Sequence, residues 1–177
     1  MLIAIDLDGP IRQLIPKLVE VYNREYRDDF RIEEITEYHL GNSFPIGNDI
    51  YQLLFKDFVQ EIYLEAEPEP GAIEAIHELK EWHQLFILTS QPAGIQEHLS
   101  RVWLERHEIN LPVTFAGGKP KSEFRFDLLI DDWVKHLRGA QEKGRKVICY
   151  RQPWNHEWPD KRMDWFKIQE VLSYEWH

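Results

Sequence analysis

Five short apolar runs, separated by longer polar or amphipathic stretches, constrain the fold of this chain more than any other feature. Each run ends in polar or small residues, and helical patterns lie between most of them; the runs span residues 2–5, 85–88, 113–116, 128–130 and 147–150. Continuous apolar runs of this length are typical of buried parallel strands that alternate with helices. We therefore predict an α/β fold with a Rossmann-like, doubly wound parallel sheet.

The interval between the first two runs is too long for an ordinary helical crossover. It contains amphipathic patterns over residues 15–26, after Ile32 and over residues 48–65. We predict that residues 14–69 form a small helical cap, inserted after the first strand into a core domain of residues 1–13 and 70–177. Further helices are predicted in the core at 72–82, 93–106 and 133–143.

The charge balance argues for a small substrate. The 177 residues include 21 Lys plus Arg and 31 Asp plus Glu, so the net charge of -10 would repel a polymeric nucleic acid. The N-terminus is apolar for only a few residues, and no stretch approaches the ~20 apolar residues that span a bilayer. We expect a cytoplasmic protein without membrane contact, with its one cysteine, Cys149, buried in a strand rather than in a disulfide. The oligomeric state stays open, and an oligomer is compatible with the sequence.

Polar side chains follow three of the predicted strands, at the edge where ligands bind in open α/β sheets. They are Asp6 and Asp8, Thr89 and Ser90, and Asp131 and Asp132, with Lys119 and Lys121 before the fourth strand. Each alone has an ordinary reading as a cap, a turn residue or part of a solvated loop. Two acidic pairs at one edge, however, would repel unless a cation lay between them, and oxygen ligands of this kind suit Mg²⁺.

The order DLDGP, ILTS, a lysine and LLIDD resembles the four motifs of the haloacid dehalogenase (HAD) superfamily, over essentially the whole chain. The resemblance implies a Mg²⁺-dependent phosphomonoester hydrolase that works through an aspartyl-phosphate. It implies that Asp6 attacks phosphorus and that Asp8 protonates the leaving group and later activates water. Pro10 departs from the usual Thr or Val after the opening glycine, which removes a backbone donor from this turn.

The same resemblance gives roles to the other motif residues. Thr89 matches the hydroxyl of the second motif, with Ser90 also available to the substrate phosphate, and Lys121 matches the third motif better than Lys119. Asp131 and Asp132 match the last motif, which leaves open which of them binds the metal directly. The implied metal ligands are Asp6, Asp8, Asp131 and Asp132.

Two segments suggest the substrate. The sequence DLLIDD (residues 127–132) and the later segment 152–155 (QPWN) resemble the 5′(3′)-deoxyribonucleotidase family and its bacterial relatives. This resemblance implies a 5′-nucleotidase that acts on (deoxy)nucleoside monophosphates. Phe44, beside a proline and near a glycine, is predicted to contact the base, whereas Tyr51 and Phe55 have the helical spacing of core residues.

Other functions remain open. A sugar phosphate could be the substrate, an alcohol rather than water could accept the phosphoryl group, or the chain could be a non-catalytic sensor of nucleotide or metal. The histidines, His136 and His177 among them, show no metal-ligand spacing and are predicted at surfaces. Four C-terminal tryptophans are predicted to pack the tail onto the body: Trp154, Trp158, Trp165 and Trp176.

Overall fold

The core domain is built on a six-stranded parallel sheet, here seen in a computed structural model that describes residues 1–174. The strand order is β3-β2-β1-β4-β5-β6, which is the order of a doubly wound sheet. The strands are β1 (Leu2–Ile5), β2 (Gln84–Thr89), β3 (Val113–Phe115), β4 (Leu128–Asp131), β5 (Lys146–Tyr150) and β6 (Arg162–Met163). The predicted Rossmann-like sheet is confirmed, and β6 is an addition to it.

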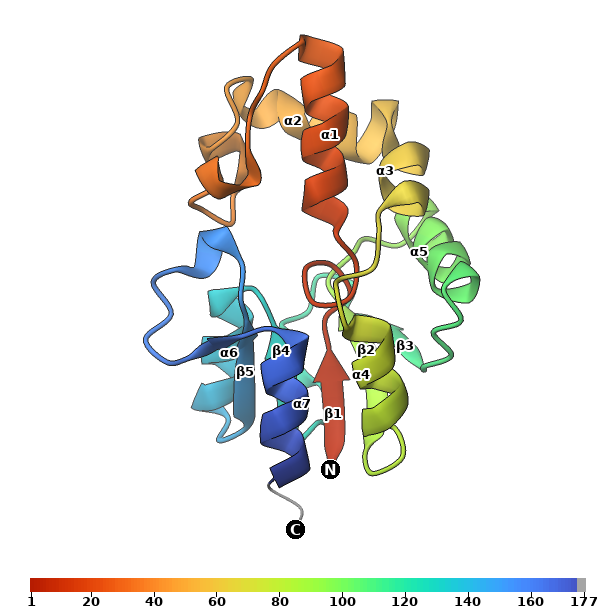
Figure 1. Cartoon of the computed structure of the whole chain (residues 1–177), viewed down its shortest axis with the longest axis vertical. Helices are drawn as coiled ribbons and strands as arrows, with labels where there is room; N and C mark the ends of the chain where they lie inside the picture. Colours follow the sequence, from red (N-terminus) through yellow and green to blue (C-terminus); the bar gives the residue numbers. More distant parts are fainter. Residues whose placement is uncertain (175–177) are drawn as a thin grey trace.

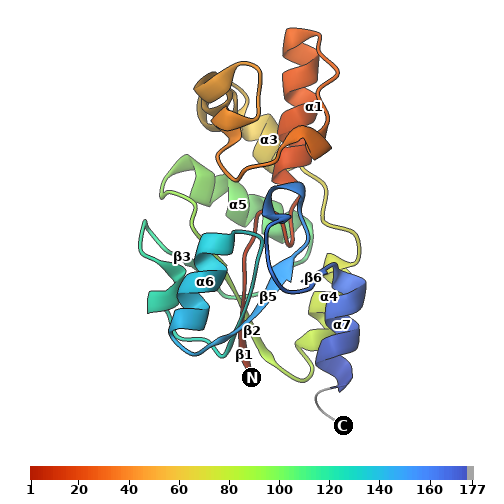
Figure 2. The ribbon, with the colours of Figure 1, turned by 90° about the vertical axis from the view of Figure 1, so that its left-hand side faces the viewer.

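Helices cover both faces of this sheet because neighbouring strand residues point to opposite sides. Ile3 and Ile5 pack with α4 (Ala72–Leu79) and α7 (Trp165–Tyr174), and with Trp103 of α5 (Ile95–Arg106). Ala4 packs on the other face with α6 (Val134–Glu142). Figure 2 shows α6 on the side of the sheet opposite α4 and α7. The sequence patterns predicted α4, α5 and α6 within a few residues, but not α7.

The cap lies above the carboxyl edge of the sheet (Figure 1). Its apolar residues form a separate cluster, which Leu99 and Trp154 of the core join. It contains α1 (Leu14–Tyr26), α2 (Ile50–Gln52), a π-helix (Leu53–Asp57), α3 (Val59–Glu65) and 3₁₀ turns at Ile32–Glu34, Leu40–Asn42 and Gly47–Asp49. The helix expected after Ile32 is thus replaced by short 3₁₀ turns joined by loops.

The continuous helix expected over 48–65 is interrupted. The amide of Phe58 donates to the carbonyl of Leu53 at 3.1 Å, five residues back, and Phe58 leaves the helical region at φ −123° and ψ 20°. A wide turn of this kind changes the direction of the neighbouring side chains. Such turns are frequent at functional sites.

Two chain segments connect the cap to the core, and they run side by side. The Gln13 amide donates to the Glu67 carbonyl and the Glu69 amide donates to the Ile11 carbonyl, both at 2.8 Å. Buried tryptophans fix both segments from the core: the Trp165 indole donates to the Pro10 carbonyl at 2.5 Å, and the Trp103 indole donates to the Ala66 carbonyl at 2.7 Å. Both segments that join the cap to the core are therefore held in place by side chains of the core.

Three of the four C-terminal tryptophans are buried, as predicted for side chains that pack the tail: Trp154, Trp158 and Trp165. Trp176 and His177 lie outside the described residues. Cys149 is buried in β5 as a free thiol, also as predicted. Among residues 1–174, no helix combines the length and the apolar character that a membrane crossing needs.

Candidate active site

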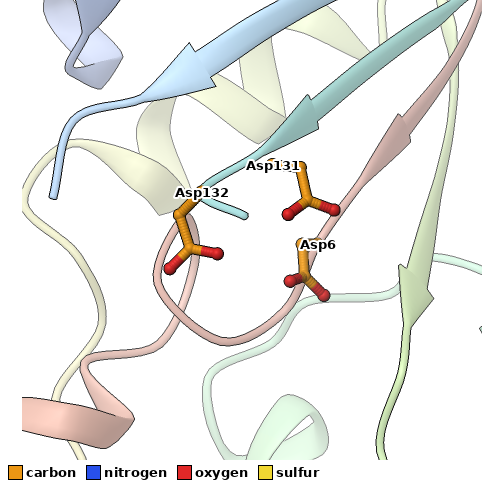
Figure 3. Close-up of side chains that lie close together, drawn as sticks. All are labelled: Asp6, Asp131 and Asp132. Carbon is orange, nitrogen blue, oxygen red and sulfur yellow. The ribbon is translucent and has the colours of Figure 1, made fainter. Parts of the chain in front are cut away.

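Three carboxylates converge at the carboxyl edge of the sheet, as Figure 3 shows. Asp6 follows β1, and Asp131 and Asp132 lie at the end of the neighbouring β4. Each offers an oxygen that lies within 4.8 Å of the others, and all three side chains are buried. The chain thus collects negative charge where it is costly unless a cation offsets it.

Lys121 is one such cation. Its ammonium nitrogen lies 2.8 Å from Asp6 Oδ1 and 2.7 Å from Asp131 Oδ2, and its side chain is fully buried. Burial alone would lower the pKa of Lys121, but Asp131 and Asp6 outweigh that effect and raise it. The ammonium therefore stays charged. Lys119, the other lysine of this segment, is exposed.

Asp131 and Asp132 have different surroundings. Asp131 accepts hydrogen bonds from Lys121 and from the Trp133 amide, at 2.7 and 2.8 Å, and its Oδ2 lies 3.1 Å from His136 Nδ1. Although burial favours the neutral acid, Lys121 and His136 hold the pKa of Asp131 below its ordinary value. Asp131 is therefore an ionised structural partner of the lysine.

The carboxylate of Asp132 instead faces the cavity beneath the cap and packs against Gly9. A β-carbon at Gly9 would lie 2.2 Å from Asp132 Oδ2, and Gly9 has φ +98°, so both space and conformation require glycine there. Burial, together with Asp131 and Asp6, raises the pKa of Asp132 well above its ordinary value. Burial raises the pKa of Asp6 as well, although Lys121 opposes the shift.

These surroundings fit a hard cation. Asp6 and Asp132 present carboxylate oxygens whose charges the nearby lysine does not fully offset, and oxygen ligands of this kind suit Mg²⁺. The sequence left open whether Asp131 or Asp132 would bind the metal directly. Asp132 is the better candidate, because the oxygens of Asp131 are engaged by Lys121, His136 and a backbone amide.

The hydroxyl residues of the second motif lie beside the carboxylates. Thr89 is buried at the end of β2, and Ser90 is exposed; both line the same cavity as Asp6. Ser90 Oγ lies 3.4 Å from His136 Nε2. The prediction of a surface position was wrong for His136, which is only 9% exposed because α6 places it against Asp131, and for His83, which is 7% exposed.

Two further polar residues, which the sequence did not single out, contact Asp8. Arg12 and Gln91 each donate to its carboxylate. Both are buried, although neither belongs to the four motifs. Asp8 and Arg12 are four residues apart, but they lie in a turn rather than on a helix, so their spacing alone predicts no contact.

Between cap and core lies a cavity of about 230 Å³, with Asp6, Asp8 and Asp132 along its wall. Most of the remaining lining is apolar or aromatic, and its aromatic members are Tyr38, Tyr51, Phe55, Tyr63 and Trp154. Tyr51 and Phe55 stack at 5.9 Å with their ring planes 6° apart. The expectation that these two are core residues was wrong for Phe55, which the break after α2 leaves 37% exposed. Tyr51 is half-buried and does pack against the apolar cluster of the cap.

Phe44 is not part of this lining. It is 3% exposed and packs inside the cap against Tyr22 and Phe30, at centroid distances of 5.2 and 4.6 Å. The prediction that Phe44 contacts the base is corrected, because aromatic neighbours from α1 and the following loop bury it.

The segment 152–155 lies beside the site, where Trp154 lines the cavity. The side-chain amide of Asn155 donates to the backbone carbonyls of Asp132 and Tyr150, at 2.9 and 2.8 Å. The side-chain amide of Gln152 donates to the Gly9 carbonyl at 3.3 Å. These bonds tie the loops that carry Asp8 and Asp132 to each other.

A family model described as 5′ nucleotidase, deoxy (pyrimidine), cytosolic type C protein (NT5C) matches residues 1–173. The chain belongs to this nucleotidase family. A candidate nucleotidase of Halalkalibacterium halodurans is 26% identical over 165 residues, which cover 86% of this chain and 80% of that protein. The resemblance to the HAD superfamily and to its nucleotidases is thus confirmed.

Solved structures support the fold. A HAD-like family hydrolase from Streptococcus pneumoniae superposes with a TM-score of 0.69 at 18% identity, over 98% of this chain and 97% of that one. A candidate HAD hydrolase from Bacillus subtilis, solved with magnesium bound, gives 0.64 at 14% identity, over 97% and 98% of the two chains. At these identities the likeness is one of architecture.

Proposed function

We propose that this nucleotidase-family member hydrolyses phosphomonoesters in a Mg²⁺-dependent reaction through an aspartyl-phosphate at Asp6, and that nucleoside monophosphates are its substrates. The observation that carries the proposal is the convergence of Asp6 and Asp132 at the wall of a cavity that aromatic rings of the cap also line, with the buried ammonium of Lys121 2.8 Å from Asp6. A phosphate group would lie at the carboxylates, and the rest of the substrate would lie against the cap.

Charge explains why the proposed nucleophile needs these neighbours. A carboxylate that approaches a phosphate at about 4 Å meets a repulsion of roughly 4 kcal/mol per pair of unit charges at an effective dielectric near 20. The ammonium of Lys121, 2.8 Å from Asp6, offsets part of this repulsion. Thr89 and Ser90 would donate hydrogen bonds to the phosphoryl oxygens.

The residues that would hold Mg²⁺ are Asp6, Asp132 and the backbone carbonyl of Asp8, with Asp131 held beside them by Lys121 and His136. A bound Mg²⁺ supplies Lewis-acid stabilisation of the charge on the phosphoryl group. The carboxylate of Asp6 forms the bond to phosphorus as the ester bond breaks, and Asp8 gives its proton to the departing alcohol. Water, activated by Asp8, then releases phosphate from Asp6.

The cavity favours a substrate with an aromatic part over a sugar phosphate. Tyr51 and Phe55 present stacked rings, and stacking on a base contributes about 1 to 3 kcal/mol in single-stranded nucleic-acid complexes. The family match points to the same substrate class.

Release of inorganic phosphate tests the proposal. The substrates are 5′- and 3′-nucleoside monophosphates, a sugar phosphate and p-nitrophenyl phosphate, each with Mg²⁺ or with a chelator. The proteins are the native chain, Asp6→Asn and, as a matched control, Asp29→Asn at an exposed cap position. We expect activity that needs both Mg²⁺ and Asp6, is unchanged in Asp29→Asn and is highest on a nucleoside monophosphate. Activity that survives Asp6→Asn would overturn the mechanism, and a preference for the sugar phosphate would overturn the substrate class.

A further inference from the structure

Both carboxylate oxygens of Asp8 are engaged by buried donors. The guanidinium of Arg12 contacts Oδ1 through Nε at 2.8 Å and through Nη2 at 2.7 Å. The side-chain amide of Gln91 donates to Oδ2. Donors on both oxygens fix the rotation of the carboxyl group as well as its position.

Arg12 is itself held on several sides. Its Nη1 donates to the backbone carbonyl of Tyr63 at 3.2 Å, and its Nη2 donates to Ser100 Oγ at 3.1 Å. Its guanidinium lies over the rings of Tyr63 and Trp103, at 4.7 and 5.3 Å from their centroids. The side chain is fully buried and cannot swing away without breaking these contacts.

Ser100 links the two donors to each other. It accepts from Arg12 and donates to Gln91 Oε1 at 2.6 Å, which leaves the amide nitrogen of Gln91 directed at Asp8. The bonds from Asp8 to Arg12, Ser100, Gln91 and back to Asp8 therefore form a closed ring.

Stability alone does not explain an arginine at position 12. Burying a guanidinium costs desolvation energy, and a buried ion pair is often no more stable than apolar side chains of the same size. Two nitrogens of the rigid, planar guanidinium do, however, contact Oδ1 of Asp8 while Gln91 donates to Oδ2, and together they hold the carboxylate in one orientation better than a lysine ammonium could. The contact between Arg12 and Asp8 therefore has the geometry expected of a residue that orients the carboxylate.

We propose that Arg12, with Gln91, is a positioning residue that fixes the carboxyl group of Asp8 for proton transfer to the leaving alcohol. The inference rests on the proposed function, because it concerns the acid-base step of that reaction. Arg12 lies in the first connecting segment, and its partner Tyr63 lies on α3 of the cap. The orientation of Asp8 is thereby tied to the position of the cap.

The leaving group supplies a sharp test. An alcohol leaves a nucleoside monophosphate only with a proton, whereas p-nitrophenolate leaves well without one. The ratio kcat/KM reports the steps up to the first irreversible one, here formation of the phosphoaspartate. General acid catalysis contributes about 10²- to 10⁴-fold. We expect Arg12→Met to lower kcat/KM about 100-fold on a deoxynucleoside 5′-monophosphate and no more than about threefold on p-nitrophenyl phosphate.

Two further variants and one control strengthen the test. Arg12→Lys keeps the charge and should recover part of the lost rate on the nucleotide. Gln91→Leu removes the other donor and should show the same dependence on the leaving group, so it carries the test if Arg12→Met does not fold. Arg24→Met is the matched control, because Arg24 pairs with Glu61 at the cap surface, and it should leave both rates unchanged.

Equal losses on the two substrates in folded Arg12→Met and Gln91→Leu, or no loss on either, would overturn the positioning role. Failure of the proposed function has a different signature. It would appear in the native protein, as hydrolysis of neither substrate or as hydrolysis that does not depend on Asp6.

Discussion

The ammonium group of Lys121 lies 2.7 Å from a carboxylate oxygen of Asp131, and neither side chain is exposed to solvent. The same nitrogen reaches Asp6 at 2.8 Å. One buried cation thus serves a structural carboxylate and the proposed nucleophile. Removing it would leave two buried acids without their nearest positive charge.

Replacing Lys121 by methionine should therefore damage both stability and activity. Breaking a buried ion pair from one side typically costs about 3 to 5 kcal/mol, because the remaining charge stays buried and unpaired. We expect a loss of this size in the free energy of unfolding, measured by urea denaturation. We also expect phosphate release to fall to the level of Asp6→Asn.

Lys119→Met is the matched control, because Lys119 is exposed two positions away. It should leave stability within about 0.5 kcal/mol of the native value. If Lys119→Met abolished activity while Lys121→Met retained it, the role given to Lys121 would be wrong.

Asp132 should make the metal-free protein less stable as the pH rises. Burial, Asp131 and Asp6 raise the pKa of Asp132 well above its ordinary value of 3.8. The folded state then holds the proton more tightly than the unfolded chain, so the free energy of unfolding falls as the pH rises from the ordinary towards the raised pKa. Without metal, Asp132→Asn should unfold at a higher temperature at pH 8, by about 2 to 4 °C for each kcal/mol gained, and this difference should shrink towards pH 4.

Mg²⁺ gives the complementary measurement. A cation that binds only the folded state raises the unfolding temperature, so Mg²⁺ should stabilise the native protein and Asp29→Asn but not Asp132→Asn. An equal Mg²⁺-induced shift in all three proteins would remove Asp132 from the metal ligands.

Most strands of the core, and the acidic residues at their ends, could be predicted from the sequence. Buried parallel strands have continuous apolar sequences, which are easy to recognise. Asp6 and Asp131 directly follow or end such runs, and adjacent parallel strands bring them together. The short β6, two residues long, gives no such signal. The spacing of Trp165, Ile168 and Leu172 does fit one helical face and would have predicted α7.

The polar residues around the motifs were not predictable in the same way. Gln91 contacts Asp8 although 83 positions of sequence separate them. His136 contacts Asp131 because the turn between β4 and α6 brings the two side chains together. A single polar residue inside a loop or helix has no period that distinguishes it from a solvated one. Such contacts come from tertiary packing.

A ring stack joins the cap to the core beside the metal ligands. Tyr38 of the cap lies flat on Trp133, which directly follows Asp132, with centroids 4.1 Å apart and planes at 8°. Aromatic pairs contribute about 0.5 to 1.5 kcal/mol beyond the area they bury. Because Tyr38 also lines the cavity, Tyr38→Ala should raise KM for a nucleoside monophosphate by about three- to tenfold.

Tyr38→Phe keeps the ring and should retain a nearly native KM. Tyr26→Ala serves as the matched control, since Tyr26 stacks on Tyr22 within the cap, at 5.0 Å. A KM change as large in Tyr26→Ala as in Tyr38→Ala would mean that general loosening of the cap, rather than the stack on Trp133, is responsible.

Phe44 and Phe55 should separate a structural from a substrate-binding aromatic residue. Phe44 is enclosed in the cap, and truncating a buried phenylalanine costs about 3 to 5 kcal/mol. Phe55 is 37% exposed and lines the cavity. We expect Phe44→Ala to lower the unfolding temperature, with a smaller effect on KM than Phe55→Ala has. Phe55→Ala should instead leave stability nearly unchanged, raise KM for a nucleoside monophosphate about tenfold and leave KM for a sugar phosphate unchanged.

Urea denaturation measures the effect on stability, and steady-state kinetics on the two substrates measures the effect on KM. Equal KM changes on nucleotide and sugar phosphate in Phe55→Ala would show that its ring does not contact a base.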